Sequence, residues 1–185
     1  MRNYLLDIWN IIDPIYCTCS RLHNVSENNQ SNSNNTLFRV RLTNYQGYDV
    51  VLQDGTIIRK HDLLIKIHLH NVKILNKMRQ TDNQFKKAIY IYHEIKRALP
   101  VLANYISFHE KSNEIKGIIG ITSLSKGANK LGFEVFDIKN NYYRTYKKYA
   151  ISPMHFIANT SIKDPVYLLM SKKNLMNNYH STRWS

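Results

Sequence analysis

The sequence predicts an α+β fold: an N-terminal helix, an antiparallel β-meander, a long amphipathic helix, and C-terminal strands that complete a mixed sheet. Three patterns lead to this prediction. Residues 37–70 alternate between apolar and polar side chains, as strands with one buried face do. Apolar residues recur with a helical period from Asn83 to about His109. Residues 115–124 form a nearly continuous apolar run of strand length.

The 185 residues suggest one domain, which we place at residues 37–173. Ahead of it, residues 1–23 predict an amphipathic helix, because these apolar side chains recur at helical spacing: Tyr4, Leu5, Ile8, Ile11, Ile12 and Ile15. This helix could pack on the domain or lie on a membrane face. Residues 24–36 are rich in Asn and Ser and have nothing to bury, so they predict a flexible loop.

The β-meander is expected over residues 37–70. Residues 37–44 and 63–70 each alternate, so each predicts a strand with one apolar face. Between them, Asp54-Gly55 is a strong hairpin signal. The inward residues are Phe38, Val40 and Leu42 in the first strand, and Leu63, Ile65, Ile67 and Leu69 in the second.

Helices are expected after the meander. Residues 72–80 predict a short helix, and Asn83 to about His109 predict a long one. Pro100 should kink or divide the long helix, because proline lacks the amide hydrogen. Residues 140–158 predict a further helix, with a break before Pro153.

Three strands are expected in the C-terminal half. Residues 115–124 suit a strand that is buried on both faces. Ser125 is then expected to cap a short helix through Leu131, with Gly132 as its C-cap glycine. Residues 133–138 and 165–171 predict the other two strands, and the order strand, short helix, strand suggests a crossover. Residues 174–185 are expected to form a tail.

The chain is strongly basic, with 26 Lys and Arg, 13 Asp and Glu, and a formal net charge of +13. Nucleic acid, an anionic lipid surface, an acidic polymer or a well-solvated basic surface would each fit this surplus. No apolar stretch reaches the roughly 18 to 20 residues of a membrane span. The two cysteines cannot build a disulfide framework. We therefore expect a cytoplasmic protein with reduced thiols, with peripheral contact at the inner face of the membrane as an alternative.

Several catalytic motifs are missing from the sequence: G-x-S-x-G, H-E-x-x-H, the phosphate-binding G-x-x-x-x-G-K-[ST] and the dinucleotide fingerprint. No cofactor is therefore expected. The glycine-containing segment Gly117–Gly127 could place an anion at a helix N-terminus. Its glycines could equally serve close packing.

The polar face of the strand at residues 63–70 carries the most informative group. Strand geometry puts five side chains on one side: Asp62, Leu64, Lys66, His68 and His70. If strand 37–44 lies beside it, its arginines join that side. The predicted ligands for a phosphate or carboxylate are then Arg39, Arg41, Lys66 and His70. The alternative is an ordinary solvent-exposed face of an antiparallel sheet.

His68 could serve in acid–base catalysis, with Asn71 orienting its imidazole ring by a hydrogen bond. We expect His68 to be buried and His70 to be exposed. Two histidines on one strand could also bind a metal, but a zinc site needs a third protein ligand. Only Asp62 and His61 are nearby in the sequence, and we therefore expect no metal site.

A second basic segment interleaves aromatic and cationic side chains: Tyr142, Tyr143, Arg144, Tyr146, Lys147, Lys148 and Tyr149. Such a segment can stack bases and neutralise phosphates. The same side chains can also pack a helix onto the domain or lie at a membrane interface.

Residues 38–71 carry the motifs R-V-R-L-T, Y-x-G, D-G-T and H-L-x-N in that order. Together with residues 4–16 and 117–138, this segment resembles the YkoP-like family of bacterial proteins. His68 and Asn71 match H-L-x-N, whereas His70 stands at its variable position. The family has no assigned reaction, and its members resemble a C-terminal region attached to some polysaccharide deacetylases.

The resemblance implies a bacterial accessory domain related to the cell envelope. The chain lacks the deacetylase motifs T-F-D-D-G and H-x-x-x-H, so that reaction is not implied. Our first hypothesis is a binding domain for an anionic partner, such as a lipid headgroup, a lipid-linked sugar or an acidic polymer. The second is a small transferase or hydrolase that uses His68, with Arg39 and Arg41 holding a phosphate or carboxylate. The third is nucleic-acid binding through the tyrosine–lysine segment.

Overall fold

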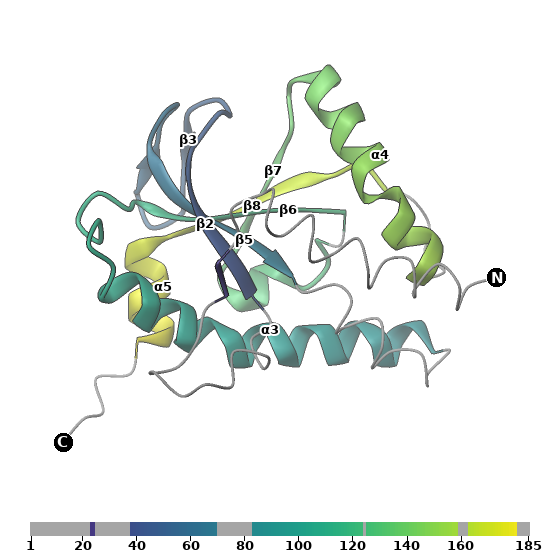
Figure 1. Ribbon diagram of the computed structural model, residues 1–185, viewed down its shortest axis with the longest axis horizontal. Coiled ribbons are helices and arrows are strands. Elements are labelled where there is room, and N and C mark those ends of the chain that lie inside the picture. Colours follow the sequence, from purple (N-terminus) through teal and green to yellow (C-terminus); the bar gives the residue numbers. More distant parts are fainter. Residues whose placement is uncertain (1–22, 25–37, 70–82, 124, 159–162, 181–185) are drawn as a thin grey trace.

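The computed structural model describes residues 23–24, 38–69, 83–123, 125–158 and 163–180, with the backbone alone at residues 23–24, 84 and 151–158. Within these residues, six strands form a mixed sheet in the order β1-β2-β5-β6-β8-β7 (Figure 1). Its strands are β1 (His23–Asn24), β2 (Phe38–Asn44), β5 (Leu63–Leu69), β6 (Gly117–Thr122), β7 (Glu134–Asp137) and β8 (Val166–Ser171). Only β5 and β6 pair in parallel; the other neighbours are antiparallel. The α+β class with a mixed sheet is confirmed.

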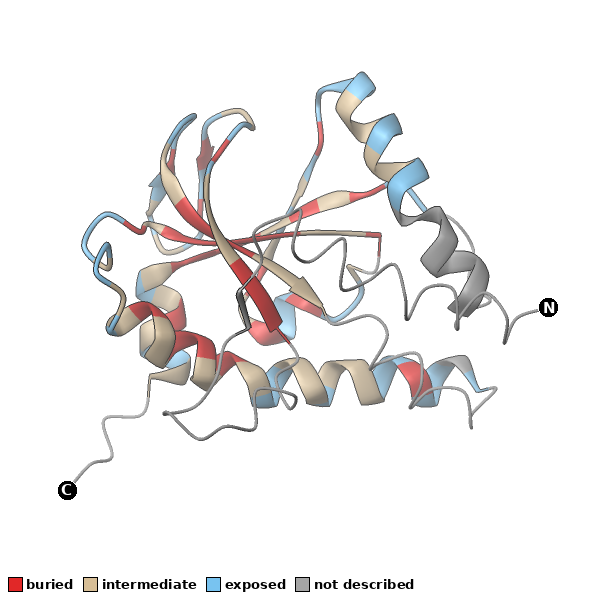
Figure 2. Cartoon of the chain, in the orientation of Figure 1, coloured by how far each residue is buried: buried red, intermediate tan, exposed pale blue. Residues whose placement is uncertain are grey.

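Two helices, α3 (Gln84–Ser107) and α5 (Lys172–Tyr179), pack on one face of the sheet (Figure 1). The sheet residues of this core include Phe38, Val40 and Ile65. The helices contribute Leu99, Leu102, Ala103 and Ile106 from α3 and Leu175 from α5. The buried band of α3 faces the sheet and its exposed band faces away, as Figure 2 shows. Burial of this apolar stripe is the main reason that α3 is stable.

A short hairpin, β3 (Val50–Val51) and β4 (Ile57–Ile58), packs its buried side chains on the opposite face. Val50, Leu52 and Ile58 contact sheet residues there, among them Leu64 and Leu169. Helix α4 (Asn141–Ala158) lies on the same side of the sheet (Figure 1), and its Tyr143 packs against this second cluster. The polar side chains of β2 and β5 point to this face.

The expected simple meander over residues 37–70 is wrong in its connectivity. Strands β2 and β5 pair directly along their whole length, and the hairpin between them forms a separate two-stranded sheet. The segment that contains this hairpin is closed at its base by two backbone hydrogen bonds. The N–H of Tyr45 donates to the carbonyl of Asp62, and the N–H of His61 donates to the carbonyl of Tyr45. The hairpin folds back over the main sheet because this buries its apolar residues against the sheet.

The C-terminal strands occur where the sequence predicts them, and β6 is buried on both faces along most of its length. The suggested crossover does not join neighbours, because β8 lies between β6 and β7 and pairs antiparallel with both. The short helix is a 3₁₀ turn over Ala128–Leu131, which begins after Gly127 and not at a Ser125 cap. Gly132 ends it at φ 84°, as expected of a C-cap glycine.

Pro100 and Pro153 both lie inside continuous helices. Helix α3 runs through Pro100 and α4 runs through Pro153, so the predicted division and break are wrong. Proline removes one backbone hydrogen bond, and in α3 the buried packing of Leu99 and Leu102 on either side offsets that loss.

Residues 174–179, expected to belong to a tail, lie in α5, where Leu175 is buried and Ser171 caps the helix. The sequence signal was weak because few apolar residues anchor this helix. His23 and Asn24, expected at the end of a helix and the start of a loop, form β1. The remaining expected N-terminal helix and Asn-rich loop, and the helix at residues 72–80, lie outside the described residues. In the part of the chain that is described, no helix has the length and apolarity that crossing a membrane requires.

Candidate functional site

The pairing of β2 with β5 brings four basic side chains together on one face of the sheet. Arg39 lies directly opposite His68, and Arg41 lies directly opposite Lys66. Side chains at directly opposite positions in an antiparallel pair have Cβ atoms about 4.5 to 5.5 Å apart. These four residues, which we call the basic sheet cluster, are the same set that the alternation of the two strands predicts, apart from His70.

The basic sheet cluster is not an ordinary solvent-exposed face. Arg39 is only 8% exposed and Lys66 only 7% exposed, whereas Arg41 and His68 are half-buried. Lys and Arg are almost never this deeply buried unless a counter-charge or ligand accompanies them. The interpretation of this face as a solvated sheet surface is therefore wrong.

A fifth basic group comes from a distant part of the sequence. Lys147 of α4 is half-buried and close enough to the cluster to lower the pKa of both Lys66 and His68. Its ammonium group lies 5.2 Å from the ring centre of Tyr143 and 5.1 Å from that of Tyr146. Sequence reasoning identified Lys147 only as part of the tyrosine–lysine segment. No local pattern could place it here, because its position depends on how α4 packs over the sheet.

Burial and mutual repulsion disfavour the charged forms of these groups. Burial, followed by the charges of Lys147 and Arg41, lowers the pKa of Lys66 from 10.5 to about 8. Burial and Arg41 likewise lower the pKa of Lys147. A like charge directly across a strand pair is destabilising. A sheet that retains the Arg41–Lys66 pair is therefore poised to gain stability from an anion.

His68 shows the same effect more strongly. Burial, followed by Lys66, Arg41, Lys147 and Arg39, lowers its pKa from 6.5 to about 3. Its Nε2 atom is buried and has no hydrogen-bond partner among the described residues. The imidazole is therefore neutral at physiological pH.

We expect the ring of His68 to stay neutral in the folded protein from pH 8 down to about pH 4, because the surrounding cations oppose a further positive charge. Two-dimensional NMR of ¹⁵N-histidine-labelled protein measures this directly. The matched reference is the urea-unfolded chain, in which His68 should titrate near pH 6.5. A folded-state titration of His68 near pH 6 would contradict this account of the site.

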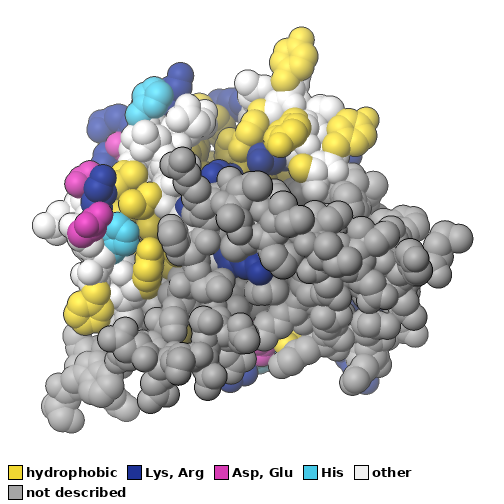
Figure 3. Space-filling model, viewed as in Figure 1, with side chains coloured by type: hydrophobic (Ala, Val, Ile, Leu, Met, Phe, Trp, Pro, Cys, Tyr) yellow, Lys and Arg dark blue, Asp and Glu magenta, His cyan; other side chains and the backbone are white. Residues whose placement is uncertain are grey.

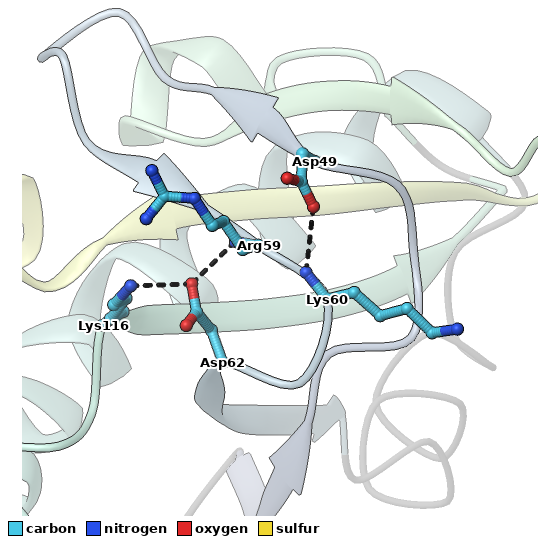
Figure 4. A network of polar contacts seen from close by, with 5 residues as sticks. All are labelled: Asp49, Arg59, Lys60, Asp62 and Lys116. Atoms are coloured by element: carbon cyan, nitrogen blue, oxygen red, sulfur yellow. Dashed lines mark hydrogen bonds and ion pairs between the residues drawn. The ribbon is translucent and has the colours of Figure 1, made fainter.

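Asp62, predicted to share the face of Lys66, lies elsewhere. It precedes β5 in a turn, where its carboxylate accepts hydrogen bonds from the backbone N–H of Arg59 (2.7 Å) and from Lys116 Nζ (2.9 Å) (Figure 4). Figure 4 also shows the nearby bond from the backbone N–H of Lys60 to Asp49, at 3.1 Å. These contacts fasten the β4–β5 turn to the start of β6. Asp62 is therefore a structural residue.

Two predicted site residues, His70 and Asn71, lie outside the described residues, so the expected orientation of His68 by Asn71 stays a prediction. No three His, Cys, Asp or Glu side chains of the described segments lie close enough to hold a metal ion. At Gly117, a Cβ atom would overlap the carbonyl oxygen of Met170, which supports the close-packing interpretation of that segment.

The fold is thus an α+β domain with a buried cluster of basic side chains on its sheet. The YkoP domain family model matches residues 2–179. The chain is also 41% identical over 184 residues to the "Uncharacterized protein YkoP" of Bacillus subtilis (strain 168), covering 97% of this chain and 98% of that protein. The chain belongs to the YkoP domain family, as its motifs suggested. No solved structure matches it.

Proposed function

We propose that this chain is a binding domain that holds a phosphate or carboxylate group against the basic sheet cluster. The observation that carries the proposal is the pairing of Arg41 with Lys66 and of Arg39 with His68, with Arg39 and Lys66 almost completely buried. Guanidinium groups bind such anions through two parallel hydrogen bonds, and a lysine adds a point charge. The half-buried Arg41, His68 and Lys147 would form the outer part of the site.

Binding is better supported than catalysis. A catalytic histidine needs a pKa near the working pH, whereas the pKa of His68 is lowered to about 3. As a neutral ring it suits a hydrogen bond to a ligand. We propose a cell-envelope group as the natural anion, either a headgroup or a sugar-linked phosphate or carboxylate, because family members resemble a region attached to some polysaccharide deacetylases.

Phosphate or sulfate should raise the melting temperature in proportion to occupancy of the site. At about ten times its dissociation constant, we expect a rise of about 3 to 5 °C for a protein of this size. Arg41→Gln should abolish this rise, because it removes a cation from the outer part of the cluster. Differential scanning calorimetry at constant ionic strength, with chloride as the reference anion, provides the measurement.

The matched control is Lys60→Gln, which removes an exposed charge in the β4–β5 turn and should leave the phosphate effect unchanged. Co-sedimentation with phosphatidylglycerol vesicles, compared with phosphatidylcholine vesicles, separates a lipid headgroup from a free anion. Loss of that co-sedimentation in Arg41→Gln would identify the headgroup as the ligand. An equal phosphate effect in wild type and Arg41→Gln would place the anion site elsewhere and overturn the proposal.

A further inference from the structure

Helix α4 exposes a stripe of three tyrosines that the proposed anion site does not use. Tyr142 is 91% exposed, Tyr146 62% and Tyr149 73%. The spacing of four and three residues puts their side chains on one side of the helix, about 6 and 4.5 Å apart along its axis. Figure 3 shows hydrophobic side chains that project from the surface in the region of α4. We call these three residues the tyrosine stripe.

The four tyrosines of α4 differ in how far they are buried. Tyr143 is partly buried and packs on the second core cluster, which anchors α4 to the domain. The interpretation of all four tyrosines as helix-packing residues is therefore correct only for Tyr143. Large exposed aromatic residues that gather on one surface indicate an interaction site.

The surroundings of the tyrosine stripe are positively charged. Residues 138–163 contain no Asp or Glu, whereas Lys139, Arg144, Lys147 and Lys148 lie among or beside the tyrosines. Lys148 is paired with Asp164 at 2.7 Å, and Lys147 belongs to the proposed anion site, so Arg144 is better placed to contact a ligand of the tyrosine stripe. The ammonium group of Lys147 lies within 5.1 Å of the ring centre of Tyr146, which sets a cation beside an exposed aromatic ring. The complementary partner is a polyanion.

We propose that the tyrosine stripe stacks the bases of single-stranded nucleic acid, while Arg144 contacts its phosphates. Aromatic platforms beside cations are the usual means of binding single strands without sequence preference. A membrane surface fits less well, because the exposed positions of residues 141–150 hold no Trp, Phe, Leu, Ile or Val. Interfacial helices use those residues to enter the lipid. This proposal does not depend on the basic sheet cluster.

Fluorescence anisotropy with a labelled oligothymidine of about 20 nucleotides tests the stacking at about 50 mM salt, where phosphate contacts are strong. We expect the triple variant Tyr142→Leu, Tyr146→Leu and Tyr149→Leu to bind at least about ten-fold more weakly than wild type. The matched triple Tyr→Phe variant keeps the rings and should bind like wild type. These positions are exposed, so all three proteins should give the same circular dichroism spectrum and melting temperature.

Lys66→Met, which removes the central charge of the sheet cluster, should retain oligonucleotide binding, so the two proposals can fail separately. Equal binding by the Leu and wild-type proteins would overturn the stacking proposal, as would no binding by wild type. If wild type and the Leu variant both bind phosphatidylglycerol vesicles but not the oligonucleotide, the partner is a membrane and the proposal is wrong.

Discussion

Replacing Gly117 with alanine is expected to lower the free energy of unfolding by about 3 kcal/mol or more, because strain in a well-packed core costs 1 to 3 kcal/mol and often more against backbone. Gly117 pairs with Ser171 where β6 meets β8 in the middle of the sheet. A Cβ atom there would overlap the carbonyl oxygen of Met170 and lie 3.2 Å from the Cα of Ser171. Backbone atoms of a central strand cannot move aside without breaking the strand pairing.

Gly120 offers a matched control in the same strand. A Cβ atom there would lie 3.5 Å from Cγ1 of Ile67 and 3.8 Å from Cβ of Leu168, which is ordinary van der Waals contact. Gly120→Ala should therefore change stability by less than about 1 kcal/mol, since a strand alanine also costs less conformational entropy than glycine. Urea unfolding monitored by circular dichroism compares the two variants. Equal losses would mean that contact with Met170 does not explain Gly117.

The result bears on how the glycine-containing segment is interpreted. If Gly117 is required by the approach of β8, that glycine needs no phosphate to explain it. Phosphate should then stabilise the wild type by binding to the basic sheet cluster and not by binding at the start of β6. The sequence alone could not distinguish an anion-binding glycine from a close-packing glycine, because the same residue type serves both roles.

Much of the fold follows from local sequence patterns. The alternation in residues 38–44 and 63–69 predicts both strands and which side chains share a face, and direct pairing of β2 and β5 agrees with it. What the patterns could not show is which segments become neighbours. The position of β8 between β6 and β7 and the folding back of the β3–β4 hairpin depend on contacts between distant residues.

The candidate site, like the fold, was only partly predictable from the sequence. Strand periodicity put Arg39, Arg41, Lys66 and His68 on one face, as the structure does. It could not show that this face is covered, since alternating polar residues usually mark a solvated surface. Lys147 joins the cluster from 81 positions beyond Lys66 in the sequence (147 − 66). A long-range helix packing of this kind leaves no periodic signal.

Replacing Lys66 with methionine is expected to raise the free energy of unfolding at pH 7, in low salt and without added anions. Methionine keeps most of the apolar stem, and the substitution removes a charge that lies among Arg41, Lys147 and His68. The shift in pKa from 10.5 to about 8 corresponds to a gain of roughly 3 kcal/mol. The exposed Lys60→Met is the control and should change stability by less than about 0.5 kcal/mol.

The pH dependence gives an independent check with a definite sign. The pKa of Lys66 is lower in the folded than in the unfolded chain, so between about pH 8 and pH 10.5 the unfolded chain binds more protons. The destabilising effect of Lys66 is therefore complete below pH 8 and disappears as pH rises through this window. Wild type should gain stability relative to Lys66→Met between pH 7 and pH 9.5. A constant difference would show that the lysine charge is not the cause.

Phosphate should also reduce the difference in stability between wild type and Lys66→Met. A bound dianion would place a negative charge beside Lys66, so at pH 7 it should stabilise wild type but leave Lys66→Met nearly unchanged. If phosphate stabilises both proteins equally, Lys66 has no part in anion binding, whatever its effect on stability. If wild type is the more stable protein at pH 7 without anions, Lys66 is already neutralised within the chain. The stability that Lys66 costs the unliganded protein is, on this argument, recovered when the anion binds.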